Sequence, residues 1–401
     1  MFNSTNSVLF PVSPKLREWI LDIRRHIHAH PELSFEEFET AKYIQGKLRE
    51  HGIVNEGGIA GTGVAAYLPG PPERRQSVAL RADMDALPVI EETDLPFASE
   101  NHGIMHACGH DGHVAMLLGA AALLAEKKLP GPVKLLFQPA EENGNGAQRC
   151  IEAGILEDVE AIFSGHIDTH HPLGTITADE GIICAWADSF IIRLRGKSGH
   201  AARPHEAVDP VVAAANLVLA VQTLISRGVD PNKAAVITIG CLQAGCAQNI
   251  IARDALLKGT IRSTHSRTRE TAMEGLLRVT ESIGHMYQVE VSLDFNDGIP
   301  AVVNDSRSVE IARVAASRTE GVLAAISQGD ASLGAEDFAC YQQKIPGCMV
   351  RFGASGRKKA GVAHNGSFDF DEDVLAIGAS WYANAAWHWL SCRYGTDFTR
   401  S

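Results

Sequence analysis

The order in which short apolar runs and helical patterns follow one another is the feature that most restricts how this chain can fold. In the first part of the chain, the apolar runs 78–80, 133–137 and 161–163 alternate with helical patterns, of which 114–127 is the most apolar. Strands separated by helices favour a largely parallel sheet that is covered on both faces. We therefore expect an α/β fold for this part of the chain.

The pattern changes after about Cys184. The elements expected there follow the order strand, helix, strand, strand, helix, strand, at 189–194, 210–226, 235–240, 255–261, 268–287 and 289–295. This order is the split βαβ motif of a ferredoxin-like α+β domain. From about Gly298 the first pattern resumes, and 401 residues exceed what one hydrophobic core usually holds. We expect a discontinuous, mixed, largely parallel-sheet main domain of residues 1–184 and 296–401, with residues 185–295 inserted as a ferredoxin-like domain.

Composition excludes several classes of partner. The net charge of −12 argues against nucleic acid, because binding phosphates needs a basic surface. The longest apolar stretch, 114–125, is too short to span a bilayer, so we expect no membrane segment. The eight cysteines are scattered without a Cys-x-x-Cys pair, which is typical of reduced thiols, and we expect a cytoplasmic protein.

The segment His106–His113 concentrates groups that bind metals. It contains three histidines, one cysteine and one aspartate within eight positions. Thiolate, imidazole and carboxylate are ligands of borderline divalent metals, and two glycines allow the backbone to turn tightly. A solvated histidine-rich loop is the alternative, but the density of the cluster favours a metal site.

Carboxylates and another histidine follow the expected strands. Asp83 and Asp85 follow the first, Glu141 and Glu142 the second, and His166 the third. Open α/β sheets bind their ligands at the carboxyl ends of the strands. Two adjacent carboxylates repel each other unless a cation compensates one of them, and the other can then act as a base. An exposed acidic turn is the ordinary explanation of a single Glu-Glu pair, but its place at a strand end favours a site.

Assembled in order, these motifs resemble the amidohydrolase branch of the aminoacylase and carboxypeptidase metallopeptidases. That branch includes hippurate hydrolases, N-acyl-amino-acid hydrolases and auxin-amino-acid conjugate hydrolases. The resemblance extends from Arg24 to Glu372, and it rests on the motifs at 24–33, 80–88, 106–113, 137–142, 196–205 and 334–338 and on the late His364.

The resemblance implies a dinuclear metal centre and a role for each matching residue. The implied metal ligands are Cys108, His110, Glu142, His166 and His364, with Cys108 as the bridging ligand. Glu141 matches the general base, and Asp85 matches a carboxylate that orients a ligand. In the inserted domain, which resembles the family's lid or dimerisation domain, His200 matches a histidine that polarises the scissile carbonyl, often in the partner subunit's site, and Asn249 and Arg262 match residues that hold the substrate carboxylate.

We therefore expect a homodimeric or larger enzyme that uses two divalent metal ions to cleave the amide bond of an N-acyl or N-aroyl amino acid. Manganese or zinc is the expected metal, and cobalt or nickel could serve. A dipeptidase or carboxypeptidase, a hydrolytic deaminase of an unusual aromatic amine, and a non-catalytic metal-binding protein are the alternatives. The run Asp168-Thr169-His170-His171 and the segments 143–146 and 244–253 depart from the family pattern, which leaves an atypical acyl group or amine open.

Overall fold

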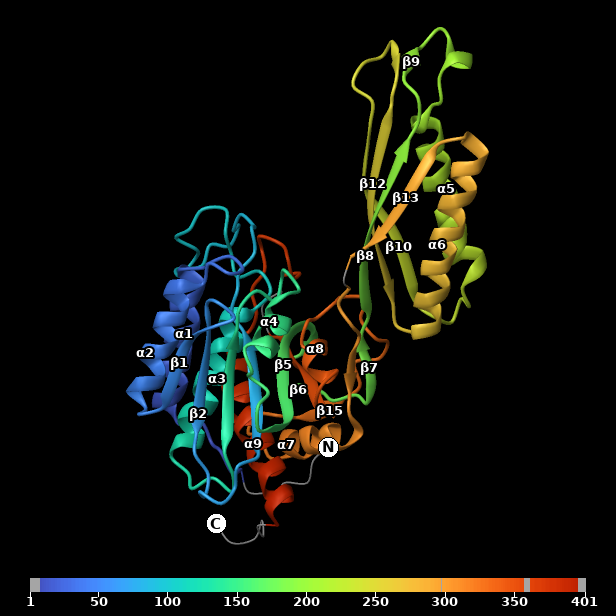
Figure 1. Ribbon diagram of the computed structural model, residues 1–401. Helices are drawn as coiled ribbons and strands as arrows, with labels where there is room; N and C mark the ends of the chain where they lie inside the picture. The colour runs from blue at the N-terminus through green and yellow to red at the C-terminus, as the bar shows by residue number, and fades with distance from the viewer. Residues whose placement is uncertain (1–7, 297, 357–360, 396–401) are drawn as a thin grey trace. The chain divides into compact units, whose positions relative to one another are not determined.

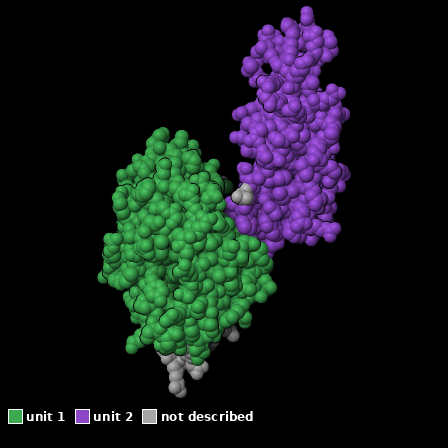
Figure 2. All heavy atoms as spheres, viewed as in Figure 1, with its two compact units in different colours: residues 1–181, 303–329, 337–401 green, residues 182–302, 330–336 purple. Residues whose placement is uncertain are grey.

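The computed structural model describes residues 8–296, 298–356 and 361–395, which separate into two compact units (Figures 1 and 2). The larger unit comprises residues 1–181, 303–329 and 337–401, and the smaller comprises 182–302 and 330–336. The sequence placed 330–336 in the main domain. In the structure this segment returns to the smaller unit, where the Ala185 N–H donates to the Ser332 carbonyl at 2.9 Å. A short segment without periodic apolar residues gave no sign of this return.

An eight-stranded sheet in the order β1-β2-β4-β3-β5-β16-β6-β15 forms the larger unit. The central strands β4, β3, β5 and β16 run parallel to one another, whereas β1, β2 and β4 pair antiparallel in turn, as do β16 and β6. This mixed, largely parallel sheet confirms the predicted fold class. Its strands are β1 (Val54–Ile59), β2 (Gly63–Leu68), β3 (Ser77–Asp83), β4 (Val133–Gln138), β5 (Val159–Pro172), β6 (Thr175–Thr177), β15 (Ala324–Ile326) and β16 (Gly347–Ser355).

Helices α3 and α9 contact each other and the central strands, and their side chains are mostly buried. The helices of this unit are α1 (Pro14–Ala29), α2 (Phe38–Glu50), α3 (His110–Ala125), α4 (Gly146–Glu152), α7 (Ser306–Ser317), α8 (Ala339–Gln342) and α9 (Val374–Tyr394). The short strands β7 (Gly181–Cys184) and β14 (Val302–Asn304) lie where the chain passes from one unit to the other.

Two elements extend further than the sequence predicted, and both changes affect the site. Helix α3 begins at His110, not at Val114, because Gly109 adopts a left-handed conformation with φ 89° and turns the chain into the helix. Strand β5 continues to Pro172 because it pairs with β16, with Arg351 opposite His166. His166 therefore lies within a strand, not in a loop after one.

The smaller unit has a four-stranded antiparallel sheet in the order β10-β12-β8-β13, with helices α5 and α6 on one face (Figure 1). This is the ferredoxin-like order expected from the sequence; a role for it as a lid or dimerisation domain stays a prediction. Its elements are β8 (Trp186–Arg195), β9 (Gly199–His200), a 3₁₀ turn (Pro204–Glu206), α5 (Pro210–Gly228), β10 (Ala235–Ala244), β11 (Ile250–Ile251), β12 (Asp254–Ser263), α6 (Ser266–Tyr287) and β13 (Glu290–Phe295).

Helix α5 has an apolar surface that its own unit does not cover. Of the helices in the described ranges, α5 alone is long and apolar enough to cross a membrane, and 22% of its most apolar stretch is buried. One face, with Ala213, Leu217 and Val221, packs into the core of the smaller unit. Leu219, on another face, is 69% exposed. A helix that packs on a sheet by one face and exposes apolar residues on another is suited to contact a partner.

A buried ionic cluster joins α1 to α3 and to the segment after His364. The Arg24 guanidinium is fully buried and donates to Asp111 at 2.9 Å and to Asp369 and Glu372 at 3.1 Å each. His28, one turn further along α1, contacts the same Asp111 oxygen at 2.9 Å. Because Asp111 follows His110 directly, this cluster holds the first turn of α3 in place.

We expect Arg24→Met to destabilise the protein by about 3–5 kcal/mol, because it leaves buried carboxylates without their cation. Arg17→Met is the matched control on the same helix, since Arg17 and Asp373 form a pair whose side chains are 50% and 64% exposed. The Arg17→Met variant should lose less than about 1 kcal/mol of unfolding free energy. Denaturant unfolding of both variants measures the difference, and equal costs would contradict a structural role for the Arg24 cluster.

Candidate metal centre

The five ligands that the resemblance implies come from separate segments of the larger unit. Cys108 precedes helix α3, His110 opens that helix, Glu142 follows β4 and His166 lies in β5. His364 lies in the loop between β16 and α9, where the His364 N–H donates to the Ala107 carbonyl at 2.8 Å. Segments distant in the sequence thus meet at the carboxyl ends of β3 and β4, beside His166 within β5.

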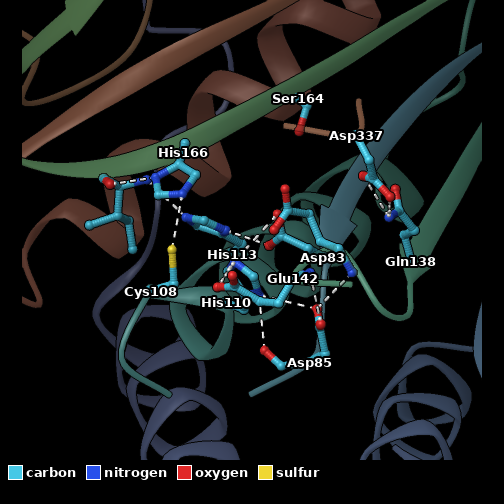
Figure 3. A network of polar contacts seen from close by, with 12 residues as sticks. Asp83, Asp85, Cys108, His110, His113, Gln138, Glu142, Ser164, His166 and Asp337 are labelled. Atoms are coloured by element: carbon cyan, nitrogen blue, oxygen red, sulfur yellow. Dashed lines mark hydrogen bonds and ion pairs between the residues drawn. The ribbon is translucent and has the colours of Figure 1, made fainter. Parts of the chain in front are cut away.

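The structure brings all five side chains together, and Figure 3 shows four of them. The Cys108 sulfur lies 3.5 Å from His166 Nε2, and Glu142 Oε1 lies 3.8 Å from His110 Nε2 and 3.5 Å from His364 Nε2. Among the described residues, three of the five groups whose ligand atoms lie within 4.8 Å of one another contain implied ligands of the centre together with Cys108 or Glu141, namely Cys108, His110 and His166; Cys108, Glu142 and His364; and His110, Glu141 and Glu142. The donors therefore fit a cluster of divalent cations.

Two of the histidines are oriented as metal ligands usually are. Nδ1 of His110 donates to the Asp85 carbonyl at 2.9 Å, and Nδ1 of His166 donates to the Ile167 carbonyl at 2.6 Å. Each bond fixes the ring and leaves Nε2 toward the cluster, as second-shell carbonyls do in metal sites.

The electrostatics of the cluster require a positive charge. Burial disfavours protonated His110, but Asp83 and Asp85 outweigh it and raise its pKa well above the ordinary value. Burial also raises the pKa of Glu142 and that of the Cys108 thiol, the latter to about 12. Within the part of the chain that the structure describes, the buried Glu142 Oε1 atom has no hydrogen-bond partner. A bound cation would replace the proton of His110, deprotonate the thiol and compensate the carboxylate.

Asp85 was expected to orient one ligand, and its carboxylate has additional contacts. Its Oδ1 accepts the Glu141 N–H and its Oδ2 the Glu142 N–H, both at 3.1 Å. The Ser34 hydroxyl donates to Oδ2 at 2.7 Å, and His110 Nδ1 lies 3.4 Å from Oδ1. Asp85 thus contacts one implied ligand and holds the backbone of both glutamates.

Asp83 is held by neighbours that the sequence did not identify. Its two oxygens contact Arg81 and His113, each at 2.6 Å, and all three side chains are buried. His113 Nε2 accepts the Ile167 N–H at 2.8 Å, directly after His166. These contacts make Asp83 a support of the centre, and His113 a support of the strand that carries His166. The resemblance did not include His113 among the implied ligands, but the local pattern of the histidine cluster alone did not separate it from them.

The structure places His200, Asn249 and Arg262 in the smaller unit. His200 and Ile250 pair across β9 and β11, and the Ala201 N–H donates to the Asn249 carbonyl at 3.1 Å, so His200 and Asn249 are neighbours. Both are exposed. Arg262 is half-buried and lies near the end of β12 where Ser263 pairs with Trp186, away from the end where Asp254 pairs with Arg195. These positions do not assign a role to any of the three.

A thiolate, imidazoles and carboxylates converging at the end of a parallel sheet, beside a second glutamate, define a metal-dependent hydrolase. Residues 79–388 match the model of the peptidase family M20/M25/M40. The chain belongs to this family, and it is an enzyme that hydrolyses amide bonds with bound metal.

Curated relatives match almost the whole chain. N-acetyl-L-cysteine deacetylase of Bacillus subtilis is 40% identical over 92% of this chain and 87% of its own length. Thermostable carboxypeptidase 1 of Saccharolobus solfataricus is 39% identical over 91% and 94%. IAA-amino acid hydrolase ILR1-like 4 of Arabidopsis thaliana is 36% identical over 93% and 86%. These relatives confirm the resemblance to the amidohydrolase branch.

A solved structure supports the number of metals. A dinuclear metal binding peptidase of the M20 family from Bacillus subtilis is 36% identical, covers 94% of this chain and 99% of its own, and superposes with a TM-score of 0.83. Together with the donor set described above, this likeness supports two divalent metal ions for this chain.

We expect Glu142→Gln to stabilise the metal-free protein at neutral pH by roughly 1 kcal/mol, because it removes a buried charge. Since the pKa of Glu142 is raised in the folded protein, its ionisation lowers the stability of the wild type as the pH rises through that value. The stabilisation by Glu142→Gln should therefore grow as the pH rises. In the metal-loaded protein the wild type should be the more stable of the two, because the variant lacks a metal ligand. Thermal unfolding with and without metal measures this, and Glu126→Gln, at an exposed position, is the control.

A Glu142→Gln protein that is less stable than the wild type in both states, or equally stable in both, would contradict the assignment of Glu142 as a metal ligand.

Proposed function

We propose that this enzyme hydrolyses the amide bond of N-acyl or N-aroyl amino acids and releases a carboxylic acid and a free amino acid. The observation that carries the proposal is a buried glutamate, Glu141, beside the five clustered ligands of the centre. The half-buried Arg262 adds a site for the carboxylate of the amino acid.

We infer that Cys108, His110, Glu142, His166 and His364 hold the two metal ions. The two groups that contain only implied ligands, Cys108 with His110 and His166 and Cys108 with Glu142 and His364, share Cys108 alone, which supports its assignment as the bridging ligand. When bound, the metals supply Lewis acidity toward water and toward the amide carbonyl. We propose manganese or zinc, with cobalt or nickel as substitutes, since the mixed donor set suits all four. The scattered free cysteines fit a reducing compartment, and we propose the cytoplasm.

Glu141 is the proposed general base. Its backbone N–H is held by Asp85, and its side chain shares a ligand group with His110 and Glu142. From this place the carboxylate can take the proton of the attacking water and later deliver it to the leaving amine nitrogen. One residue then performs both proton transfers, and no second acid is required.

His200 has the tautomer that a carbonyl-polarising residue needs. Its Nδ1 accepts the Ala202 N–H at 3.0 Å, so the ring proton of the neutral side chain is on Nε2. That nitrogen can donate to the oxyanion that develops at the scissile carbonyl, an interaction worth roughly 3–4 kcal/mol in the transition state.

Arg262 and Asn249 are the proposed anchors of the substrate carboxylate. Burial lowers the pKa of the Arg262 guanidinium, and Asp188, whose charge acts in the opposite direction, accepts two hydrogen bonds of 2.6 Å from Arg269. A half-buried guanidinium whose neighbouring acid is engaged elsewhere is suited to bind a carboxylate in a bidentate manner.

His200 and Arg262 cannot serve the same small substrate within one chain. His200 lies beyond the sheet end where Asp254 pairs with Arg195, whereas Arg262 lies near the end where Ser263 pairs with Trp186. Eight residues separate Asp254 from Arg262 along β12, or roughly 26 Å at about 3.3 Å per residue. Because Asn249 neighbours His200, a site that uses all three residues must take Arg262 from one copy and the His200–Asn249 pair from another.

The smaller unit offers a surface for that second copy. The apolar face of α5 exposes Val211, Val212 and Leu219, and β10 is an edge strand that exposes Val236 and Leu242. An open strand edge and an exposed apolar helix face are both suited to pairing. We therefore propose a homodimer through this unit.

Peptide substrates are the second candidate, because a carboxypeptidase is 39% identical to the chain. A peptide that ends in a free carboxylate presents the same amide and the same anchor, so the chemistry is identical. A panel of N-acyl amino acids and dipeptides, assayed with each metal, separates the two. Turnover of dipeptides but of no acyl amino acid would overturn the first proposal in favour of the second.

We expect Glu141→Gln to lose turnover by at least about three orders of magnitude, since the amide cannot accept the proton of the attacking water. The variant should still bind two metals per chain, because Glu141 is not one of the proposed ligands. Metal analysis and single-substrate kinetics on the same preparation measure both quantities. Appreciable turnover in metal-loaded Glu141→Gln would reject Glu141 as the base.

Mixing two inactive variants tests the contribution of the second copy. In a dimer of His200→Ala with Glu141→Gln, one site combines an intact Glu141 with the partner's intact His200, so co-refolded mixtures should regain about a quarter of wild-type activity. Each variant refolded alone is the control and stays inactive. If His200 acts within its own chain, the mixture regains nothing.

A further inference from the structure

The backbone that carries Glu141 is held by buried carboxylates at three consecutive residues. The Ala140 N–H donates to Glu37 Oε1 at 2.9 Å, and the N–H groups of Glu141 and Glu142 donate to the two oxygens of Asp85 at 3.1 Å. Asp85 belongs to the centre already described. Glu37 comes from the start of helix α2, and the proposed function gives it no role.

Glu37 is fully buried, and both of its carboxylate oxygens accept hydrogen bonds. Oε1 accepts the Ala140 N–H, and Oε2 accepts the hydroxyl of Thr62 in the turn between β1 and β2. Burying a carboxylate is unfavourable unless it is hydrogen-bonded, and here burial raises the pKa of Glu37. The contacts thus join helix α2, the β1–β2 turn and the residue before Glu141.

Ala140 needs such support because its backbone is strained. It is a non-glycine residue with φ 54°, in the left-handed region, and its side chain is fully buried. A residue in this region persists only when its surroundings hold it there. The Glu37 carboxylate, which accepts the hydrogen bond of the Ala140 N–H, is the side-chain partner of that group.

The other end of the same loop is fixed separately. Asp337 Oδ2 accepts the Ala147 N–H at 2.9 Å, and a side chain at Gly146 would collide with the Pro139 carbonyl. The loop is therefore held after Glu142 by contacts other than Glu37, and the Gly146 N–H also donates to the Ala140 carbonyl at 3.2 Å. Loss of Glu37 should release the Ala140 end of the loop, where Glu141 begins, more than the Ala147 end.

We propose that Glu37 is a positioning residue for the general base, which fixes the direction of the Glu141 side chain by holding the left-handed turn at Ala140. This inference rests on the proposed function of Glu141. The contacts of Glu37 are with the Ala140 N–H and the Thr62 hydroxyl, so its effect on the base passes through the backbone. A change in the direction of the Glu141 side chain should therefore lower kcat and leave KM and the metal content unchanged.

The test compares Glu37→Leu with Glu37→Gln in the metal-loaded enzyme, on the best substrate of an N-acyl amino acid panel. Leucine fills the space but accepts no hydrogen bond, so kcat should fall by about 10- to 100-fold with KM and two metals per chain unchanged. Glutamine keeps a carbonyl oxygen that can accept the Ala140 N–H, so Glu37→Gln should retain most of the kcat that Glu37→Leu loses. Glu36→Leu is the matched control, since that neighbouring side chain is exposed.

Glu37→Asp provides a second test if the leucine variant does not fold. It keeps the charge but withdraws the carboxylate by one methylene, so kcat should again fall at constant metal content. Wild-type kcat in a folded Glu37→Leu or Glu37→Asp enzyme would overturn the inference. Loss of metal in parallel with kcat, or equal losses in Glu37→Leu and Glu37→Gln, would also overturn it, because either result indicates a general structural role.

The failure of this inference can be distinguished from failure of the proposed function. If metal-loaded Glu141→Gln turns over normally, Glu141 is not the base and the proposed function fails. If Glu141→Gln is inactive while Glu37→Leu keeps its kcat, only the positioning role of Glu37 is wrong.

Discussion

The carboxylate of Asp85 is the contact on which the geometry of the centre depends. Its two oxygens hold the backbone of Glu141 and Glu142, and its carbonyl orients His110. The ring of one implied ligand, the backbone of another and the proposed base are thus fixed by a single residue at the end of β3. Because Asp85 is buried, these bonds form where water competes least.

The parallel strands explain why such a residue can exist. Neighbouring parallel strands end at the same edge of a sheet, so the segments after β3 and β4 meet there, close to His166 in β5. Burying several carboxylates at this edge is unfavourable without compensation. Arg24 and Arg81 compensate the outer ones, Asp111 and Asp83, whereas a buried oxygen of Glu142 has no hydrogen-bond partner among the described residues. The remaining negative charge is the physical reason for a metal at this place.

The sequence predicted the fold class and the residues that gather at the centre, because both leave local patterns. The alternation of apolar runs with helical patterns indicated the sheet, and the density of donors between His106 and His113 indicated the site. It did not predict the length of β5, which depends on pairing with β16, or the start of α3, which depends on the left-handed turn at Gly109. Nor did it single out Glu37, since the exposed Glu36 beside it is chemically identical and only the tertiary fold separates them.

The central claim is that five side chains bind a pair of metals beside Glu141. Anomalous diffraction from crystals of the metal-loaded enzyme, measured at the absorption edge of the added metal, tests it most directly. The account predicts two anomalous peaks per chain, one bonded to each side of the Cys108 sulfur, with His110, Glu142, His166 and His364 completing their coordination. A fully loaded crystal whose metals lie elsewhere, or whose peaks leave out these side chains, would contradict it.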